Sequence, residues 1–472
     1  MAPPAGLIQD PEILEGYLTD ASNIPGQASG LLRPDSAEQV AEIFRAAQAQ
    51  GQPLTVTAQR TSTTGGPVPH GGWLLSTERL RGLRWLDDQR IRVGAAELLA
   101  EVEALAQEKG RFYPPDPTSW RECSVGGTLA CNASGARSYR YGATRPWVES
   151  AQVVLPTGEI VEADRSTPIP AHWPVPEWTP PQVKTAAGYH PADNLLDLII
   201  GSEGTLGLVT AATLRTLPLP ERVFSILAFF PSIQAGLDFV EAARQAQAGP
   251  RLLEWYDAGC LELVRARVPE VPSTAVAAVW IEVETDAQAE DQALMNWADL
   301  LSQTGALEEH TLFAADESGM ERLGRIRHAI PAGVNEQVVA NGMPKVGTDF
   351  AVPDAGLARM MAAYGAVELE SVLFGHIGDN HLHLNLLPKT PQELEQAWAI
   401  WGRLYDLALS LGGTLSAEHG VGKLKQPYLR RMVGDPGIAA FQALKRAADP
   451  AWILGRGSLL ADPVAASSAR SV

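Results

Sequence analysis

The residues best suited to chemistry lie in two short segments of the second half of the chain. Residues 375–383 and 416–420 together hold four of the nine histidines, and Glu418 directly precedes the last of them. Imidazole and carboxylate are ligand types that zinc, manganese and iron(II) prefer. A further histidine beside such a site is a candidate general base, because its pKa lies near working pH. The two segments therefore predict a divalent metal site with a base next to it.

The spacing of the histidines leaves the ligand set open. His381 and His383 alternate with leucines, as residues on one face of a strand do, so the residues alone favour them as a pair. In that interpretation His376 is a turn residue. Glycines in both segments break helices, and we therefore expect two strand or loop edges that the fold brings together.

The overall charge limits the classes of partner. With 37 basic and 55 acidic residues, the net charge is -18, which argues against nucleic acid or an anionic membrane as the main partner. An anionic substrate would need a local arginine or a metal. The 472 residues are enough for two or three domains.

Cysteine usage and the lack of long apolar runs predict a cytoplasmic protein. The three cysteines, Cys123, Cys131 and Cys260, form no CxxC pair, which fits a reducing compartment without disulfides or an iron–sulfur cluster. The N-terminus does not read as a signal peptide, and no apolar run approaches the ~20 residues of a membrane span. We expect no transmembrane segment.

The elements that must position these residues fall into two patterns. Residues 31–220 alternate strand and helix signals: strands at 54–57, 72–76, 91–93 and 150–155, helices at 36–50 and 96–110, and a proline-rich loop at 165–182. From residue 221, strands at 225–230, 275–283 and 373–387 are each followed by a helix, at 233–248, 287–303 and 390–411. This second pattern predicts an α+β domain with helices packed on an antiparallel sheet.

Three glycine-rich segments of the first pattern predict a binding site for a large anionic ligand. They span residues 60–66, 126–135 and 201–207. Backbone N–H groups approach an anion closely only where side chains are small. None matches a P-loop or a Rossmann fingerprint. Any single one reads as a tight turn, but three in one domain favour a shared ligand.

The order of these segments resembles the FAD-binding oxidoreductases of the vanillyl-alcohol oxidase type, over about residues 31–459. Within them it resembles the D-2-hydroxyacid dehydrogenases: glycolate oxidase flavin subunits, D-lactate dehydrogenases and D-2-hydroxyglutarate dehydrogenases. The resemblance implies an α+β fold with a two-subdomain FAD-binding domain at 1–220 and an α+β cap domain with an antiparallel sheet at 221–411. A small helical C-terminal segment at 412–472 would complete the active site and pack on the FAD domain.

The resemblance also implies a non-covalent FAD. The family's RGxGTSxxGG loop is matched from Thr61 to Gly66, and relatives that link flavin covalently often have histidine where Thr61 stands. The family's closing NPGK reads Gly-Arg-Gly-Ser at 455–458, and Lys184 continues the match. The implied FAD-binding residues are Thr61, Ser62, Thr63, Thr64, Gly65, Gly66, Pro115, Asp116, Ser124, Gly126, Gly127, Asn132, Ser134, Gly135, Gly142, Glu203, Gly204, Leu206 and Gly207.

The family's metal motif, HxGDGNLH, reads HIGDNHLH at 376–383. By this match His376, His383 and Glu418 are the ligands of a zinc or manganese ion, and His419 is the base. Asn stands where the motif has Gly, and His381 stands where it has Asn. The site therefore carries one imidazole more than the motif.

The implied reaction is the oxidation of a 2-hydroxyacid. The metal makes the substrate hydroxyl more acidic, His419 accepts its proton, and flavin N5 takes the α-hydride. Arg327 matches the family's carboxylate-binding arginine, and Arg suits this role because its guanidinium is bidentate. Lys345 and Asn385 are further candidates for substrate binding.

The expected partners are a small anionic 2-hydroxyacid and a separate electron acceptor, which is a flavoprotein, a quinone, a cytochrome or an iron–sulfur subunit. A homodimer is compatible with the sequence. Three alternatives remain open: a metal-dependent hydrolase without flavin, a non-catalytic scaffold subunit of a larger oxidase complex, and a flavin enzyme that uses another alcohol donor.

Overall fold

The N-terminal strands form two sheets that differ in strand direction. In the computed structural model, which describes residues 4–247 and 249–463, a small parallel sheet has the order β1–β3–β2. It comprises β1 (Gly30–Leu32), β2 (Leu54–Thr57) and β3 (Trp73–Ser76), flanked by α1 (Pro11–Glu15) and α2 (Ala37–Gln50). The expected helix α2 is confirmed: the Ser36 side chain accepts the N–H of Gln39 at 3.3 Å, and Gly51 ends the helix in the left-handed conformation.

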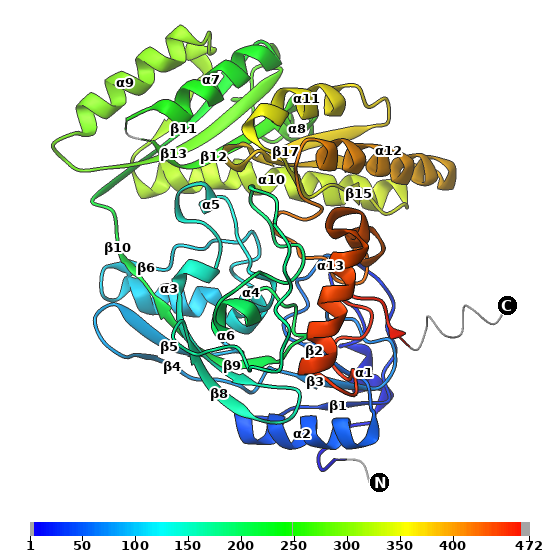
Figure 1. Ribbon diagram of the computed structural model, residues 1–472. Helices are drawn as coiled ribbons and strands as arrows, with labels where there is room; N and C mark the ends of the chain where they lie inside the picture. The colour runs from blue at the N-terminus through cyan, green and yellow to red at the C-terminus, as the bar shows by residue number, and fades with distance from the viewer. Residues whose placement is uncertain (1–3, 248, 464–472) are drawn as a thin grey trace.

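The second sheet is antiparallel, with the order β4–β5–β9–β7–β8. Its strands are β4 (Leu83–Trp85), β5 (Arg90–Gly94), β7 (Val148–Val154), β8 (Ile160–Asp164) and β9 (Leu208–Arg215). Helices α3 (Leu99–Gln107), α4 (Val125–Cys131), α5 (Ser138–Tyr141) and α6 (Leu195–Ile199) belong to the same half of the molecule, as do the short paired strands β6 (Arg111–Phe112) and β10 (Leu217–Pro218) (Figure 1).

The glycine-rich run at 126–135 is partly helical, since α4 covers its first half. Gly126 is needed there for packing, because a Cβ would lie 2.8 Å from the Cβ of Ala95. The proline-rich stretch 165–182 forms no helix or strand, as expected. Its continuation carries Lys184 toward the second half of the molecule.

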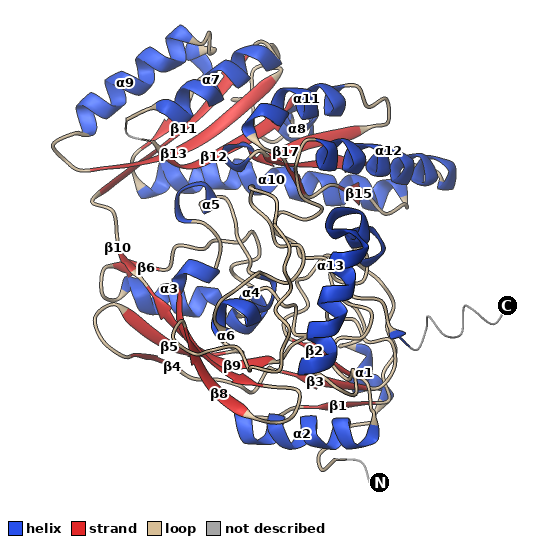
Figure 2. Cartoon of the chain, viewed as in Figure 1, coloured by secondary structure: helices blue, strands red, loops and turns tan. Residues whose placement is uncertain are grey.

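The second half is built on one large antiparallel sheet with the order β14–β11–β13–β12–β17–β18–β15, and β16 also pairs with β18. The strands are β11 (Arg222–Phe230), β12 (Pro250–Asp257), β13 (Ala277–Thr285), β14 (Leu312–Ala314), β15 (Val346–Gly347), β16 (Phe350–Ala351), β17 (Ser371–His376) and β18 (His381–Leu386). The expected α+β architecture is confirmed (Figure 2).

Alternating side chains of β11 divide between the two faces of this sheet. Phe224, Ile226 and Phe230 join the core that holds α7 (Ile233–Gln245) and α9 (Glu290–Gln303). Leu227 and Phe229 join the core that holds α8 (Ala258–Arg265) and α10 (Glu317–Asn341). The period of two therefore places helices on both faces.

The C-terminal segment returns from the large sheet to the small ones. After α11 (Asp354–Gly365) and α12 (Pro391–Ser410), the chain passes through residues 411–425 and enters α13 (Gln426–Ala448), which is kinked at Gly434. Helix α13 runs from the level of the large sheet down beside the parallel sheet (Figure 2). The N–H of Leu54 then donates to the carbonyl of Ile453 at 2.8 Å. The residues between α12 and α13 thus lie at the junction of the two halves.

Within the described ranges, no helix has the length and apolar character required to cross a membrane.

Candidate functional site

A tight hairpin gathers three of the four predicted histidines. His376 ends β17 and His381 begins β18, and the two are register partners. The turn between them is a short 3-10 helix (Ile377–Asp379) followed by Asn380 in the left-handed conformation. His376 is therefore a strand residue, and its interpretation as a turn residue is wrong. Gly375 has a φ of 135°, and a Cβ there would lie 2.9 Å from Cδ2 of His383, so glycine makes room for that ring.

The carboxylate of Glu418 lies at the centre of these rings. Its Oε2 is 3.2 Å from Nε2 of His376 and 3.8 Å from Nδ1 of His381, and its Oε1 is 3.2 Å from Nε2 of His383. The four ligand atoms lie within 4.8 Å of one another. Glu418 and the three histidines form what we call the histidine cluster.

Each ring of the histidine cluster is fixed by an acceptor behind it. Nδ1 of His376 is hydrogen-bonded to Glu254, and Nε2 of His381 to Asp349 at 2.8 Å. Nδ1 of His383 donates to the backbone carbonyl of Thr348 at 3.1 Å. In every case the other ring nitrogen faces Glu418, an arrangement typical of metal-binding histidines.

Asp349 and Glu254 were not among the residues predicted from the sequence. Asp349 is buried and also accepts hydrogen bonds from Nζ of Lys425 at 2.6 Å and from the backbone N–H of His419 at 3.1 Å. Glu254 stands on β12, more than 100 residues before its partner His376. No local motif connects such residues, because the pairing depends on strand order.

The carboxylates around the cluster are held in the charged form. Burial acts to raise the pKa of Glu418, but Lys184 and His376 outweigh it and hold the pKa well below its usual range. Burial likewise opposes ionisation of Glu254, and its neighbours His376 and Arg327 nevertheless lower the pKa to about 2. Burial lowers the pKa of His376, but Glu254 and Glu418 raise it to about 9.

His419 lies at the open edge of the cluster, with 35% of its side chain exposed. Its ring stacks on His383, at 5.2 Å between centroids and 15° between planes. Nδ1 is 3.5 Å from Oδ2 of Asp349, and Nε2 is 3.6 Å from Oε1 of Glu418. Desolvation of its inner edge lowers the pKa of His419 to about 4, so the ring is uncharged near pH 7, as a proton acceptor must be.

Arg327 reaches the cluster through Glu254. It projects from α10, its Nε lies 3.6 Å from Oε2 of Glu254, and its guanidinium stands 5.6 Å from the ring centre of Trp280. Arg327, Glu254 and His376 thus form a chain that leads to Glu418. Only 17% of the Arg327 side chain is exposed, so this arginine is not a surface charge.

The two other predicted substrate residues contact each other. Nζ of Lys345 donates to Oδ1 of Asn385 at 2.8 Å. Asn385 follows His383 by two residues on β18 and so shares its face of the sheet. Burial lowers the pKa of Lys345.

The N-terminal half of the molecule contributes the other wall of the site. Nζ of Lys184 is 2.9 Å from Oε2 of Glu418 and 2.9 Å from Oγ of Ser138, and Oγ of Ser138 donates to Asp379 at 2.6 Å. Oγ of Ser134 lies 3.4 Å from Oε2 of Glu418. The histidine cluster therefore sits where the two halves of the molecule meet.

The loop at residues 61–66 has the features of an anion cradle. Among residues 4–247 and 249–463, no protein group accepts the backbone N–H groups of Thr61, Ser62, Thr63 and Gly66. The carbonyls of Gly65 and Gly66 are instead bonded to Nζ of Lys423, at 3.2 and 3.0 Å. Free amides beside a cation suit a pyrophosphate.

Buried hydroxyls without a protein partner add to this fit. In the described part of the chain they include Oγ1 of Thr57, at the end of β2, and Oγ of Ser124, at the start of α4. Lys423 also contacts Oγ of Ser458 at 3.1 Å, so the altered 455–458 segment still lies against the loop. The residues present thus fit a dinucleotide such as FAD.

Some predicted FAD residues are engaged by the protein itself. Both oxygens of Glu203 accept backbone N–H groups, from Val421 and Gly422, at 2.7 Å each. Oδ1 of Asp116 accepts the N–H of Arg137 at 3.0 Å. Glu203 therefore anchors the segment after His419 to the FAD-binding half, and a direct contact of either carboxylate with FAD stays a prediction.

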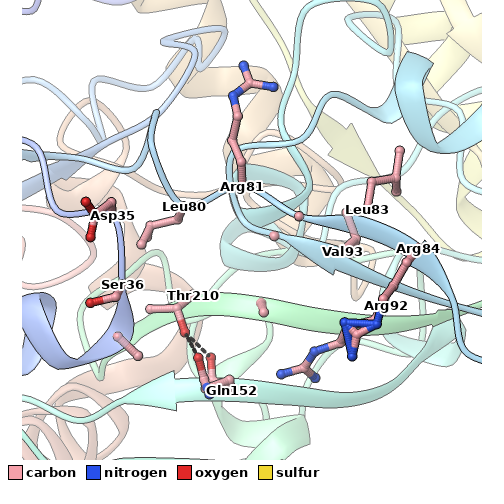
Figure 3. Close-up of a pocket in the computed structure, with 14 residues that line it drawn as sticks. Asp35, Ser36, Leu80, Arg81, Leu83, Arg84, Arg92, Val93, Gln152 and Thr210 are labelled. Atoms are coloured by element: carbon pink, nitrogen blue, oxygen red, sulfur yellow. Dashed lines mark hydrogen bonds between the residues drawn. The ribbon is translucent and has the colours of Figure 1, made fainter.

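A separate pocket of about 270 Å³ lies between α2 and the antiparallel sheet of the N-terminal half. Figure 3 shows Arg81, Arg84 and Arg92 along it, and a hydrogen bond from Thr210 to Gln152 of 2.8 Å. It contains none of the residues predicted for the site. We assign it no part in the chemistry.

Two family models match the chain. "FAD linked oxidases, C-terminal domain" matches residues 219–459, and "FAD binding domain" matches residues 28–164. A D-2-hydroxyglutarate dehydrogenase of Xanthomonas citri is 31% identical, over 90% of this chain and 88% of its own length. A glycolate oxidase subunit of Bacillus subtilis is 28% identical, over 91% of this chain and 88% of its own length. A D-lactate dehydrogenase of Anaerostipes hadrus is 28% identical, over 97% of this chain and 95% of its own length.

Solved structures confirm the fold class. An alkyldihydroxyacetonephosphate synthase superposes with a TM-score of 0.70 over 96% of this chain and 82% of its own, at 16% sequence identity. At this identity the likeness shows the fold alone. These findings confirm the expected FAD-binding fold of the vanillyl-alcohol oxidase type. They also confirm that an α+β part with an antiparallel sheet follows it.

Proposed function

The chain belongs to the FAD-linked oxidases, and from this premise we propose that it oxidises a small D-2-hydroxyacid to the 2-oxoacid. It is an FAD-dependent oxidoreductase, as its family and its relatives show. The observation that carries the choice of substrate class is the histidine cluster, with the ring of His419 stacked on His383 and the guanidinium of Arg327 3.6 Å from Glu254. A base and a carboxylate-binding cation are what a hydroxyacid needs.

We further propose that a zinc or manganese ion binds His376, His383 and Glu418. The donor set fits, because two imidazole nitrogens face the carboxylate at 3.2 Å, close to the separation of about 3.3 Å between ligands of a tetrahedral ion with bonds of about 2.0 Å. When bound, the ion supplies Lewis acidity toward the substrate hydroxyl, and FAD supplies the hydride acceptor.

The residues of the chain then have distinct tasks. His419 accepts the hydroxyl proton at Nε2, and Asp349 stabilises the imidazolium through Nδ1. Arg327 holds the substrate carboxylate, while Lys345 and Asn385 bind the substrate from the face of β18. Lys184 keeps Glu418 charged and in place.

An anaerobic bleaching panel tests this function. D-lactate, glycolate, D-malate and D-2-hydroxyglutarate are added separately to the oxidised holoenzyme, and loss of flavin absorbance is followed. We expect at least one D-2-hydroxyacid to bleach the flavin and its L-enantiomer to do so far more slowly. A protein without flavin colour would point to the metal-dependent hydrolase. A yellow protein that no member of the panel bleaches would point to the scaffold subunit or to another alcohol donor.

We propose that reoxidation uses a separate electron acceptor and that the protein works in the cytoplasm. The three described cysteines are unpaired, which suits a reducing compartment.

FAD is expected to be non-covalent. Thr61 stands at the position where a linking histidine is found in covalent relatives, and a threonine hydroxyl is a much poorer nucleophile than imidazole toward the flavin. Denaturation with acid followed by filtration should release all of the flavin into the filtrate. Yellow colour that stays with the denatured polypeptide would contradict this expectation.

The metal ligands are tested by His383→Ala. Removal of one of three ligands should lower the metal content and the turnover together, while FAD stays bound, because His383 lies outside the loop at 61–66. Elemental analysis and flavin absorbance of the same sample measure both. His310→Ala, at an exposed histidine, is the control and should leave both values unchanged. Full metal content in the His383 variant would remove this residue from the ligand set.

A further inference from the structure

We infer that His381 supplies, through Nδ1, a fourth protein ligand to the divalent ion of the histidine cluster. This inference rests on the proposed metal site and extends it beyond the three-ligand set of the family motif. The motif has asparagine at this position, so the extra imidazole is a feature of this chain. The question is whether His381 is a ligand or a neutral neighbour.

The hydrogen bonds of the cluster determine the tautomer of each ring. A backbone carbonyl only accepts hydrogen bonds, so the proton of neutral His383 is on Nδ1, toward Thr348, and Nε2 carries a lone pair. Ionised Asp349 likewise only accepts, so the proton of neutral His381 is on Nε2 and the lone pair is on Nδ1. Glu254 accepts from Nδ1 of His376, so the lone pair of that ring is on Nε2 once the ring is neutral.

In the neutral rings these lone pairs point at the carboxylate of Glu418. Nδ1 of His381 faces Oε2 at 3.8 Å, and Nε2 of His383 faces Oε1 at 3.2 Å. A nitrogen lone pair that faces a carboxylate oxygen in a buried site is unfavourable, because both atoms are acceptors, unless a cation lies between them.

The environment of Nδ1 of His381 points to the same conclusion. His381 has no exposed surface, and this nitrogen has no hydrogen-bond partner among the described residues. A buried polar atom without a partner destabilises the fold. Bond formation from Nδ1 to the ion removes that cost, and Asp349 behind Nε2 orients the ring as outer carboxylates do at metal sites.

Direct counting of imidazole ligands tests the inference. The FAD-loaded protein is depleted of metal with a chelator, reconstituted with one equivalent of Zn²⁺, and studied by zinc K-edge X-ray absorption, which flavin does not disturb. We expect three imidazoles in the unchanged protein and two in His381→Asn, the residue of the family motif. Chelator competition should show at least a roughly 10-fold weaker affinity for Zn²⁺ in the variant, since even loss of an outer partner costs about 10–100-fold.

The outcomes separate this inference from the proposed function. Two imidazoles in the unchanged protein, with equal Zn²⁺ affinity in His381→Asn, would overturn the role of His381 and leave the three-ligand site standing. No stoichiometric Zn²⁺ in either protein would overturn the metal site as well. His419 is the other imidazole that could supply a third ligand, so a count of three that persists in His419→Asn decides the matter even if the His381 variant does not fold. His310→Asn is the matched control and should keep three imidazoles and the parent affinity.

Discussion

His419→Asn is expected to slow the reduction of flavin by substrate roughly 10²–10⁴-fold, the usual contribution of a positioned general base. Asparagine can still donate to Asp349 from the place of Nδ1, but it offers no basic nitrogen where Nε2 stands. Metal and FAD content should stay at the parent level. Rapid-mixing kinetics under anaerobic conditions measure the rate of the single reduction step.

The control for this experiment is His310→Asn, because His310 is exposed and lies outside the cluster. It should reduce its flavin at the parent rate. Substrate affinity, taken from the concentration dependence of the reduction rate, should change little in His419→Asn, since the carboxylate of the substrate is assigned to Arg327. If His419→Asn is reduced as fast as the unchanged protein, the hydroxyl proton goes to another group.

Local sequence patterns predicted the elements with clear periodicity. The helix at 36–50 has a capping serine and an apolar stripe, and it appears as α2 with nearly the same ends. The strand segments at 225–230, 275–283 and 373–387 of the large antiparallel sheet were predicted, whereas β12, between β13 and β17, was not. The longest helix, α10, was not predicted, because Pro331 and three glycines interrupt its pattern and only burial against α8 and the sheet stabilises it.

The candidate site was predictable only where its residues form local clusters in the sequence. The histidines of 376–383 and the pair Glu418–His419 are visible as local clusters of titratable residues. Glu254 is an isolated carboxylate in the apolar strand β12, and Asp349 lies between the short strands β15 and β16. Nothing near either residue in sequence marks its role. Their position behind His376 and His381 depends on β12 lying beside β17 and on β16 lying beside β18, which no local pattern specifies.

The histidine spacing was misleading about His376, because a strand face is only one way to bring side chains together. The period of two favoured His381 with His383 and left His376 in a turn. The hairpin instead makes His376 the register partner of His381, so that residues five apart in sequence face each other across the strands. A predicted ligand set therefore needs the strand register as well as the spacing along one strand.

Arg327→Ala is expected to weaken substrate binding, by roughly 2–5 kcal/mol, the range for truncation of one partner of a buried charge pair. Since 1.4 kcal/mol is a factor of ten, this corresponds to about a 30- to several-thousand-fold increase in the dissociation constant. The rate of flavin reduction at saturating substrate should fall much less than in His419→Asn. Rapid mixing over a range of substrate concentrations gives both values from one data set.

Arg325→Ala is the matched control, because Arg325 lies on the same helix with 70% of its side chain exposed and should bind substrate as the parent does. Metal content must be measured alongside, since loss of Arg327 leaves the buried carboxylate of Glu254 facing His376 without its cation. A variant with full metal and weak binding identifies Arg327 as the group that holds the substrate. A variant that loses metal but binds substrate normally once metal is restored would show that Arg327 acts on the cluster through Glu254.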